Sequence, residues 1–317
     1  MLAFVARRVA QAALVLLIMS FVIYGLMGLM PGDPLDIMMG SAPGMTPEVM
    51  AQLRALYGLD QPLLLRYWRW LAAALSGDLG YSRTHAVPVL QVLLPALWQT
   101  AKLMLASFAI SVILALVLGV VSALRPGGIA DSLIGLFAFA GISVPVFWLA
   151  LILILVFAVE LRWLPASGMG TVGDHGVLDQ IRHLALPVLT LVLYNTGAFT
   201  RYVRAAMIET LHMDFVRTAR AKGAGPARVV LVHALRNALI PVVTVMALSF
   251  GTLFSGALVT ETMFAQMGMG KTIYDAILSN DYNLALTGLL FATLVTLLAN
   301  LAADLAYGWL DPRVTPR

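Results

Sequence analysis

The sequence of 317 residues contains no cysteine and few charged residues. Without cysteine, a disulfide framework and a thiolate metal site are both excluded, and nothing indicates a redox compartment. Charged residues make up only 11% of the chain, against about 25% in an average soluble domain. Hydrophobic residues make up 61%, and the mean hydropathy is +0.91. This composition predicts an integral membrane protein.

Six apolar segments without a charge are long enough, or nearly so, to cross a bilayer core of about 30 Å. They are residues 9–30, 103–124, 132–159, 184–200, 238–260 and 284–303. The fourth is short and contains Pro187, so we expect it to be kinked or to extend into its flanks. The first ends in the bulky Leu29-Met30-Pro31 rather than in a cleavage site, which favours an uncleaved helix. The predicted fold is an all-α polytopic membrane protein with six transmembrane helices.

Positive charge is concentrated in the connections on one side of these segments. With six spans, the two termini, the 125–131 turn and the 201–237 connection share a side, which holds twelve of the twenty Lys and Arg. The positive-inside rule makes that side, and both termini, cytoplasmic. The net charge of +4 is divided among loops, so no nucleic-acid partner is expected. We therefore expect an N-terminus and first helix in 1–30, an external helical segment in 31–102, and a five-helix core in 103–317.

The external segment carries its own helix signals. Thr46-Pro47-Glu48 is typical of a helix start, with an N-cap, a first-turn proline and a first-turn acid. Residues 63–75 mix leucine with arginine, tyrosine and tryptophan, a composition typical of the membrane interface. Two interpretations of this second helix remain open: a lid packed on the helix ends, or a docking surface for an external partner.

The cytoplasmic loop 201–237 is basic and divides into short pieces. Asp214 can cap a short helix over residues 215–222, and Gly223 can end it in a left-handed conformation. Gly225-Pro226 then starts a second helix that leads into the fifth span. On the short helix, Phe215 and Ala219 lie four residues apart and share a face, which predicts a small apolar surface with basic neighbours.

This short helix resembles the coupling helix of importer permeases in the ATP-binding cassette superfamily. Their loop has the pattern EAA, three residues, G, nine residues, I-x-L-P, of which Ala219, Gly223 and Leu235 match here. The form TARAKG followed by HALRNALIP is similar to the variant in dipeptide, oligopeptide and nickel permeases. Further matching segments are PGDP (31–34), YGLD (57–60), GDLGYS (77–82), SVPVFW (143–148) and WLPASG (163–168). After the fifth span, Glu261 and Phe264 match the family pattern, while Gln266 and Met267 replace its Pro-Gly.

The resemblance implies a pore-forming subunit of a type I ABC importer in a bacterial inner membrane, with residues 103–317 as the permease core. Its implied partners are membrane lipid, a second homologous permease chain in a heterodimer, two ATP-binding cassette subunits and an extracytoplasmic solute-binding protein. It implies that ATP and Mg²⁺ bind those cassette subunits and that this chain holds no cofactor. The residues expected to dock on the ATPase are Asp214, Phe215, Thr218, Ala219, Lys222 and Gly223. Peptides are the expected cargo, with nickel or another small solute as the alternative.

Enzymatic and metal-binding readings have weaker support in the sequence. Gly270-Lys271-Thr272 is similar to the end of a phosphate-binding loop, but Ala265 stands where the motif requires its first glycine. The only cluster with metal-like composition is Asp174, His175, Asp179 and His183, and loop residues of these types are more often solvated. No catalytic residue and no metal site is therefore predicted.

Polar residues within the spans are candidates for the solute path or for packing between helices. They are Asn195 on the fourth span, Ser249, Thr252 and Ser255 on the fifth, and Thr293, Thr296 and Asn300 on the sixth. Spacings of three and four residues place those of each helix near one face. No span carries a charge and no inverted repeat is found, so an ion-coupled secondary transporter is only a distant alternative.

Overall fold

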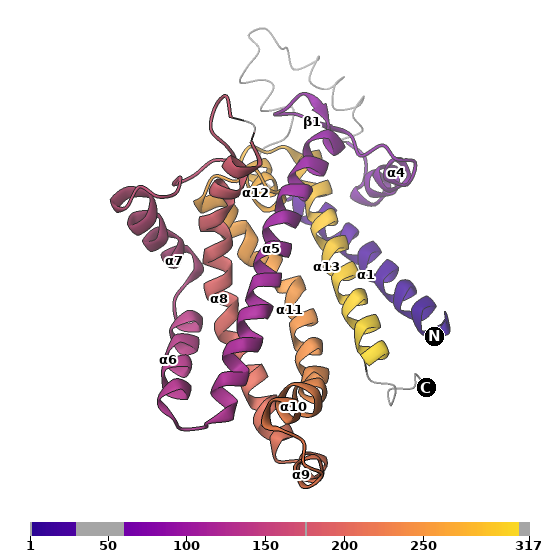
Figure 1. Cartoon of the computed structure of the whole chain (residues 1–317). Helices are drawn as coiled ribbons and strands as arrows, with labels where there is room; N and C mark the ends of the chain where they lie inside the picture. Colours follow the sequence, from indigo (N-terminus) through magenta and orange to yellow (C-terminus); the bar gives the residue numbers. More distant parts are fainter. Residues whose placement is uncertain (1, 30–59, 175, 311–317) are drawn as a thin grey trace. The chain divides into compact units, whose positions relative to one another are not determined.

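The computed structural model describes residues 2–29, 60–174 and 176–310, almost all of them helical (Figure 1). The expected helix that opens at Thr46 lies outside these residues. The described elements, in chain order, are α1 (Leu2–Gly28), α4 (Leu63–Leu75), β1 (Tyr81–Ser82), β2 (Val87–Pro88), α5 (Val89–Leu124), α6 (Ile129–Ser143), α7 (Val146–Leu153), the π-helical turn η1 (Ile154–Glu160), α8 (Val177–Leu211), α9 (Asp214–Ala221), α10 (Pro226–Arg228), the π-helical turn η2 (Val229–Ala234), α11 (Leu235–Met263), α12 (Met269–Leu278) and α13 (Tyr282–Leu310).

The prediction of an all-α polytopic membrane protein is confirmed. Among the described residues, five helical stretches are long and apolar enough to cross a membrane: Val5–Gly28, Val89–Leu124, Val177–Leu211, Pro226–Met246 and Tyr282–Ala302. The predicted third span, 132–159, contains a sharp bend, and the structure has six spans if the bent pair counts as one. The pair is Ile129–Ser143 and Val146–Glu160, bent by 107°. Val144 precedes Pro145, and steric contact with the proline ring moves Val144 out of the helical region to φ −92° and ψ 126°.

The fourth span extends far beyond the predicted 184–200. It belongs to α8, whose 35 residues include Pro187 without ending there, and which measures about 52 Å at about 1.5 Å per residue. The helix therefore continues past both ends of its apolar segment.

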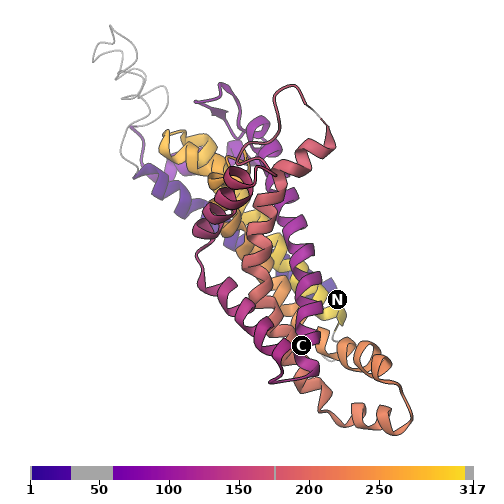
Figure 2. The same cartoon turned by 60° about the vertical axis from the view of Figure 1, so that its left-hand side comes forward.

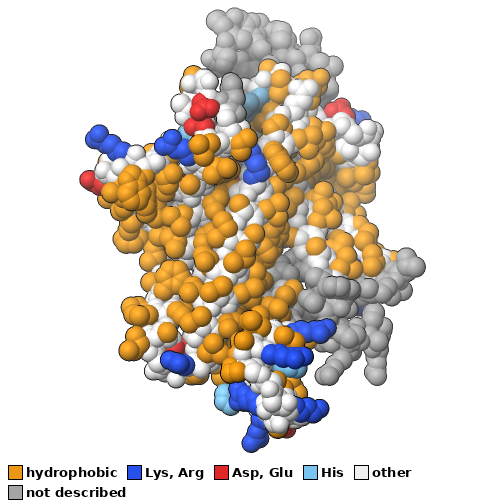
Figure 3. Space-filling view, in the orientation of Figure 1, with side chains coloured by type: hydrophobic (Ala, Val, Ile, Leu, Met, Phe, Trp, Pro, Cys, Tyr) orange, Lys and Arg blue, Asp and Glu red, His pale blue; other side chains and the backbone are white. Residues whose placement is uncertain are grey.

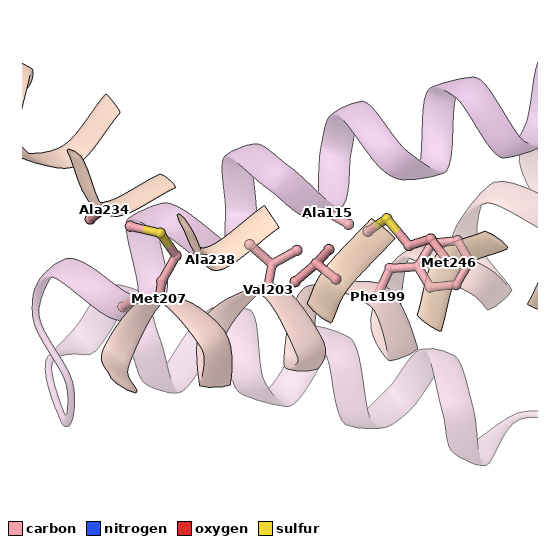
Figure 4. Packing of buried hydrophobic residues seen from close by; sticks show 9 residues of the cluster. Ala115, Phe199, Val203, Met207, Ala234, Ala238 and Met246 are labelled. Atoms are coloured by element: carbon pink, nitrogen blue, oxygen red, sulfur yellow. The ribbon is translucent and has the colours of Figure 1, made fainter. Parts of the chain in front are cut away.

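The chain divides into two compact units, and the first contains residues 98–271 with 1–4 and 295–317. In this unit α8 packs against α6, α7 and α11. Figure 4 shows the core where α8 meets α5 and α11, with Ala115, Phe199, Val203 and Met246 buried together. On the face drawn in Figure 3, hydrophobic side chains cover α5 to α8, and Lys and Arg gather over α9 and α10. An apolar exterior between charged ends is what a lipid environment requires.

Glycines let the helices of this unit approach closely. A Cβ on Gly197 of α8 would lie 2.5 Å from the Ala138 carbonyl oxygen of α6, and one on Gly141 would lie 2.8 Å from the Leu193 oxygen. On the side facing α5, a Cβ on Gly119 would lie 2.5 Å from the Val203 Cβ. Helices in lipid associate through such close packing because no hydrophobic effect drives them together.

The second unit contains residues 5–97 and 272–294. Here α4 occupies Leu63–Leu75, as predicted, and packs on α1 through aromatic rings. The Tyr67 ring is buried, and its hydroxyl lies 2.8 Å from that of Ser20. Trp68 is 58% exposed. The helix is thus fixed on one side and leaves an aromatic side chain on the other.

A β-hairpin, which the sequence did not predict, joins the turn before α13 in this second unit. Strands β1 and β2 pair antiparallel, with Tyr81 opposite Pro88. Asp281 accepts hydrogen bonds from the Ser82 hydroxyl at 2.6 Å and from the Thr84 hydroxyl and backbone N–H at 2.7 and 2.9 Å. Burial alone would raise the pKa of Asp281, but these donors outweigh it and hold the pKa below its usual value. The ionised carboxylate therefore ties the hairpin to the 279–283 turn.

Candidate functional site

Helix α9 lies at the end of the first unit opposite the 161–174 loop (Figures 1 and 2). Only His212 and Met213 separate it from α8, and it contacts the π-helical turn η2 that leads into α11. Val216 is fully buried and fixes the helix on its support. Helix α9 is therefore connected through short segments to two long helices, α8 and α11.

The start of α9 differs from the prediction. Asp214 was expected to cap the helix, but the N-cap is Met213, which makes no side-chain cap bond, and Asp214 is the first helical residue. Its carboxylate lies 3.6 Å from an Arg217 nitrogen, and both side chains are exposed. An acid in the first turn still favours the helix through the positive end of the helix dipole. Thr218 donates a hydrogen bond to the Asp214 carbonyl oxygen at 3.0 Å, within the helix.

The end of α9 agrees with the prediction for Gly223. This residue has φ +82°, in the left-handed region. The Gly223 N–H donates to the Arg220 oxygen at 3.0 Å and the Ala224 N–H to the Ala219 oxygen at 3.1 Å. These two bonds form a Schellman motif, with Lys222 as the C-cap. Pro226 then begins α10, as expected from Gly225-Pro226.

The apolar face of α9 is divided. Phe215 is 38% exposed, whereas Ala219 is half-buried and Val216 is completely buried. Val216 therefore makes the contact between α9 and the rest of the unit. This residue was not identified from the sequence, although its position one turn before Ala219 could have indicated it. Phe215 stays at the surface, with Arg217, Arg220 and Lys222 also exposed.

An ion pair that the sequence did not predict fixes α8 to the turn between α5 and α6. Arg204 donates from Nε to one Asp131 oxygen at 2.7 Å and from an Nη to the other at 2.8 Å. The same carboxylate accepts the Ser122 hydroxyl and, at 2.8 Å, the Gly127 N–H. A bidentate arginine pair sets orientation as well as distance. The ion pair therefore holds the end of α8 that leads to α9 against the turn between α5 and α6.

We expect Asp131→Ala to release this turn. The Gly127 N–H would lose its acceptor, and its amide exchange should accelerate by about tenfold, the effect of one lost hydrogen bond of ordinary strength. Hydrogen exchange of the assembled protein measures it. Arg204→Lys keeps the charge but loses the bidentate geometry and should give a smaller increase. Asp214→Ala, which removes an exposed carboxylate from α9, is the control; unchanged Gly127 exchange in Asp131→Ala would contradict the role of the pair.

Several solute-path candidates bond within their own helices. Asn195 donates to the Leu191 carbonyl at 2.7 Å, Ser249 to Val245 at 2.8 Å, and Thr293 to Leu289 at 2.9 Å. Asn195, Ser249, Thr293, Thr296 and Asn300 are half-buried. The side chains of Thr252 and Ser255 lie outside the described residues. A role of these residues in the path remains a prediction.

Other polar groups of the first unit are more deeply buried than these candidates. The hydroxyls of Ser111, Thr196 and Thr200 are buried without a hydrogen-bond partner among the described residues. Thr196 and Thr200 lie four residues apart on one face of α8. Their spacing was visible in the sequence, but burial without a partner is a tertiary property.

Asp179 and His183 bond within the loop before α8 and the start of that helix. Both Asp179 oxygens accept bonds from Thr171, from its N–H at 2.7 Å and its hydroxyl at 2.8 Å. The Nδ1 atom of His183 lies 2.9 Å from the Asp179 carbonyl oxygen. Among the described residues no three His, Cys, Asp or Glu side chains gather in a group that could hold a metal. His175 is outside those residues.

Known proteins resemble this chain over its full length. Residues 115–316 match the family model of the binding-protein-dependent transport system inner membrane component, and residues 1–115 match its N-terminal counterpart. A di/tripeptide transport system permease protein of Pseudomonas aeruginosa is 38% identical over 99% of both chains. An oligopeptide transport system permease protein of Bacillus subtilis and a dipeptide transport system permease protein of Escherichia coli are each 34% identical, again over 99% of both chains.

The solved structure of a methionine ABC transporter in an inward-facing conformation has a similar fold. Its TM-score is 0.56 at 19% identity, covering 70% of this chain and 97% of that one. The chain belongs to the family of inner membrane components of binding-protein-dependent transport systems. It is thus a multi-pass membrane permease of the ABC importer type, as the motifs around Gly223 indicated.

Proposed function

We propose that this chain forms, with a second homologous permease, the pore of an ATP-driven importer of short peptides. The observation that carries the peptide assignment is the full-length match to permeases named for di/tripeptide, dipeptide and oligopeptide transport. The proposed partners are two ATP-binding cassette subunits, which bind ATP and Mg²⁺, and a solute-binding protein outside the membrane.

The proposed docking element for the ATPase is α9. A short helix with an exposed Phe215 beside Arg217 offers an aromatic side chain and an arginine, two residue types that are enriched in protein interfaces. The Schellman motif fixes the end of α9. When a bound ATPase moves, the force on α9 is therefore transmitted to α8 and α11 and does not unwind the helix. Closure of two ATPase subunits on ATP would then draw two such helices together and open the pore outward.

The proposed orientation places α9 and both termini in the cytoplasm. A cysteine at Lys222 and one at Asp60 should then react with a membrane-impermeant reagent from opposite sides only. Both residues are exposed, and the chain has no other cysteine to confuse the labelling. Labelling of both positions from the same side would overturn the orientation.

Reconstituted transport tests the function directly. Proteoliposomes with the complete complex should take up a labelled dipeptide only with ATP and the binding protein present, and uptake should persist after ionophores collapse ion gradients. Uptake that needs an ion gradient would contradict the ATP-driven mechanism. ATP-driven uptake of Ni²⁺ without uptake of any peptide would contradict the cargo.

A further inference from the structure

A polar pocket of about 550 Å³ is lined in part by the 169–174 segment. This segment lies at the end of the first unit opposite α9 (Figure 1). Gln99 and Lys102 of α5 line the pocket, with Gln180 of α8, Gln266, and the 169–174 segment including Asp174. Its volume lies within the range of about 300 to 1,000 Å³ that is typical of small-molecule sites. The pocket thus has room for a small solute and carries one cation and one anion.

Buried bonds hold the loop side of this pocket. Asp179, of which 8% is exposed, accepts both the N–H and the hydroxyl of Thr171. A Cβ on Gly170 would lie 3.2 Å from an Asp179 oxygen, so the segment lies directly on the carboxylate. Gly170 and Thr171 are therefore held in place before any ligand arrives, which lowers the entropy cost of binding.

A second lining residue that is fixed is Gln266, at one of the two positions that depart from the family pattern. Its amide nitrogen donates to the Gly168 oxygen at 2.6 Å, and it is 3% exposed. The loop that carries it is held by buried Glu261, which accepts the Thr100 hydroxyl and, at 3.0 Å, the Lys271 N–H. A Cβ on Gly268 would lie 2.1 Å from the Glu261 carboxyl group, so this segment has no room to shift.

The two charges of the pocket suit a zwitterion. Lys102 is half-buried and has no ion-pair partner among the residues that the structure describes. Asp174 keeps its orientation by accepting the Gly176 N–H at 2.8 Å. A partly desolvated cation without a counter-charge favours an anionic ligand group. The amides of Gln99, which is half-buried, and of Gln180, which is exposed, can donate to and accept from the peptide bonds of a ligand.

We infer that this pocket binds a short peptide with free termini. Lys102 binds the terminal carboxylate, Asp174 binds the terminal ammonium, and Gln99 and Gln180 bond the amide groups between them. The inference rests on the proposed peptide cargo and adds a site on the permease itself, apart from the solute-binding protein.

Protection of an introduced cysteine from labelling tests peptide binding in the pocket independently of transport. Gln180→Cys would place a single cysteine in the pocket, and Gln91→Cys, exposed on the same α5 helix as Lys102, provides an outside control. In the assembled transporter without binding protein, alanyl-alanine should protect position 180 from a maleimide and leave position 91 unprotected. Lys102→Met or Asp174→Asn should raise the half-protecting concentration by about tenfold or more, the effect of one lost charged hydrogen bond.

Blocked peptides separate recognition from structural damage. Asp174→Asn should leave protection by N-acetyl-alanyl-alanine unchanged, because that ligand has no ammonium, and Lys102→Met should do the same for alanyl-alanine amide. Asp78→Asn is the matched control, since Asp78 accepts the Gly80 N–H at 2.9 Å in the same kind of turn outside the pocket. Peptide import without protection of position 180 would overturn the pocket and leave the proposed function intact. Protection without peptide import would support the pocket and overturn the proposed function.

Discussion

Gly223→Val is expected to abolish coupled uptake. Gly223 has φ +82°, and no heavy atom lies within 4 Å of the position of an added Cβ, so the cost is entirely one of backbone conformation. For a β-branched residue a left-handed conformation costs about 1 to 3 kcal/mol. An isolated helix of eight residues is already marginal in water, so a cost of this size is enough to lose the Schellman end of α9.

Gly225→Val is the matched control for this change. Gly225 lies two residues further along the same loop with φ −65°, and an added Cβ there also meets nothing within 4 Å. The control should therefore transport normally. Uptake and ATP hydrolysis measured on the same proteoliposomes should show that Gly223→Val lowers uptake per ATP at least about tenfold, as a lost conformational preference of about 1.4 kcal/mol requires. Wild-type coupling in Gly223→Val would contradict the docking role of α9.

Local signals in the sequence predicted the elements whose ends depend on local chemistry. Helix α4 occupies the predicted 63–75, and Gly223 ends α9, because an amphipathic pattern and a left-handed glycine each act within a few residues. The bend at Val144-Pro145 could also have been predicted from the sequence. A segment of 28 residues would span about 42 Å as a helix, longer than a bilayer core of about 30 Å, and it contained a proline near its middle.

Contacts between distant residues could not be predicted in this way. Asp131 and Arg204 are separated by 73 positions, and neither lies in a motif that indicates its partner. Asp281 lies 199 positions from Ser82, so the hairpin it holds has no local signal beyond four strand residues. Helix α8 continues past its apolar segment because its polar ends bond within the fold: Asp179 to Thr171, and Arg204 to Asp131. Hydropathy marked the part of the helix suited to lipid, and tertiary contacts set its length.

Gly197→Val should prevent the first unit from packing. The new Cβ would lie 2.5 Å from the Ala138 oxygen and 3.2 Å from its carbonyl carbon, and both are backbone atoms of a helix that cannot rotate away. Overpacking of a core costs about 1 to 3 kcal/mol when side chains can adjust; here we expect at least about 3 kcal/mol, because the obstacle is main chain. The purified complex should lose its single peak in size-exclusion chromatography or melt well below the wild type.

Gly135→Val separates this effect from helix propensity. Gly135 lies on α6, the helix that Gly197 contacts through Ala138, but it is exposed, and an added Cβ meets nothing within 4 Å. Valine is no worse than glycine in a helix interior, so this variant should assemble and melt like the wild type. Equal loss in both variants would show that glycine itself, rather than the close approach of α8 and α6, is required. These helices have only packing and polar contacts to hold them together in lipid, so loss of this close approach removes a large part of what joins α8 to α6.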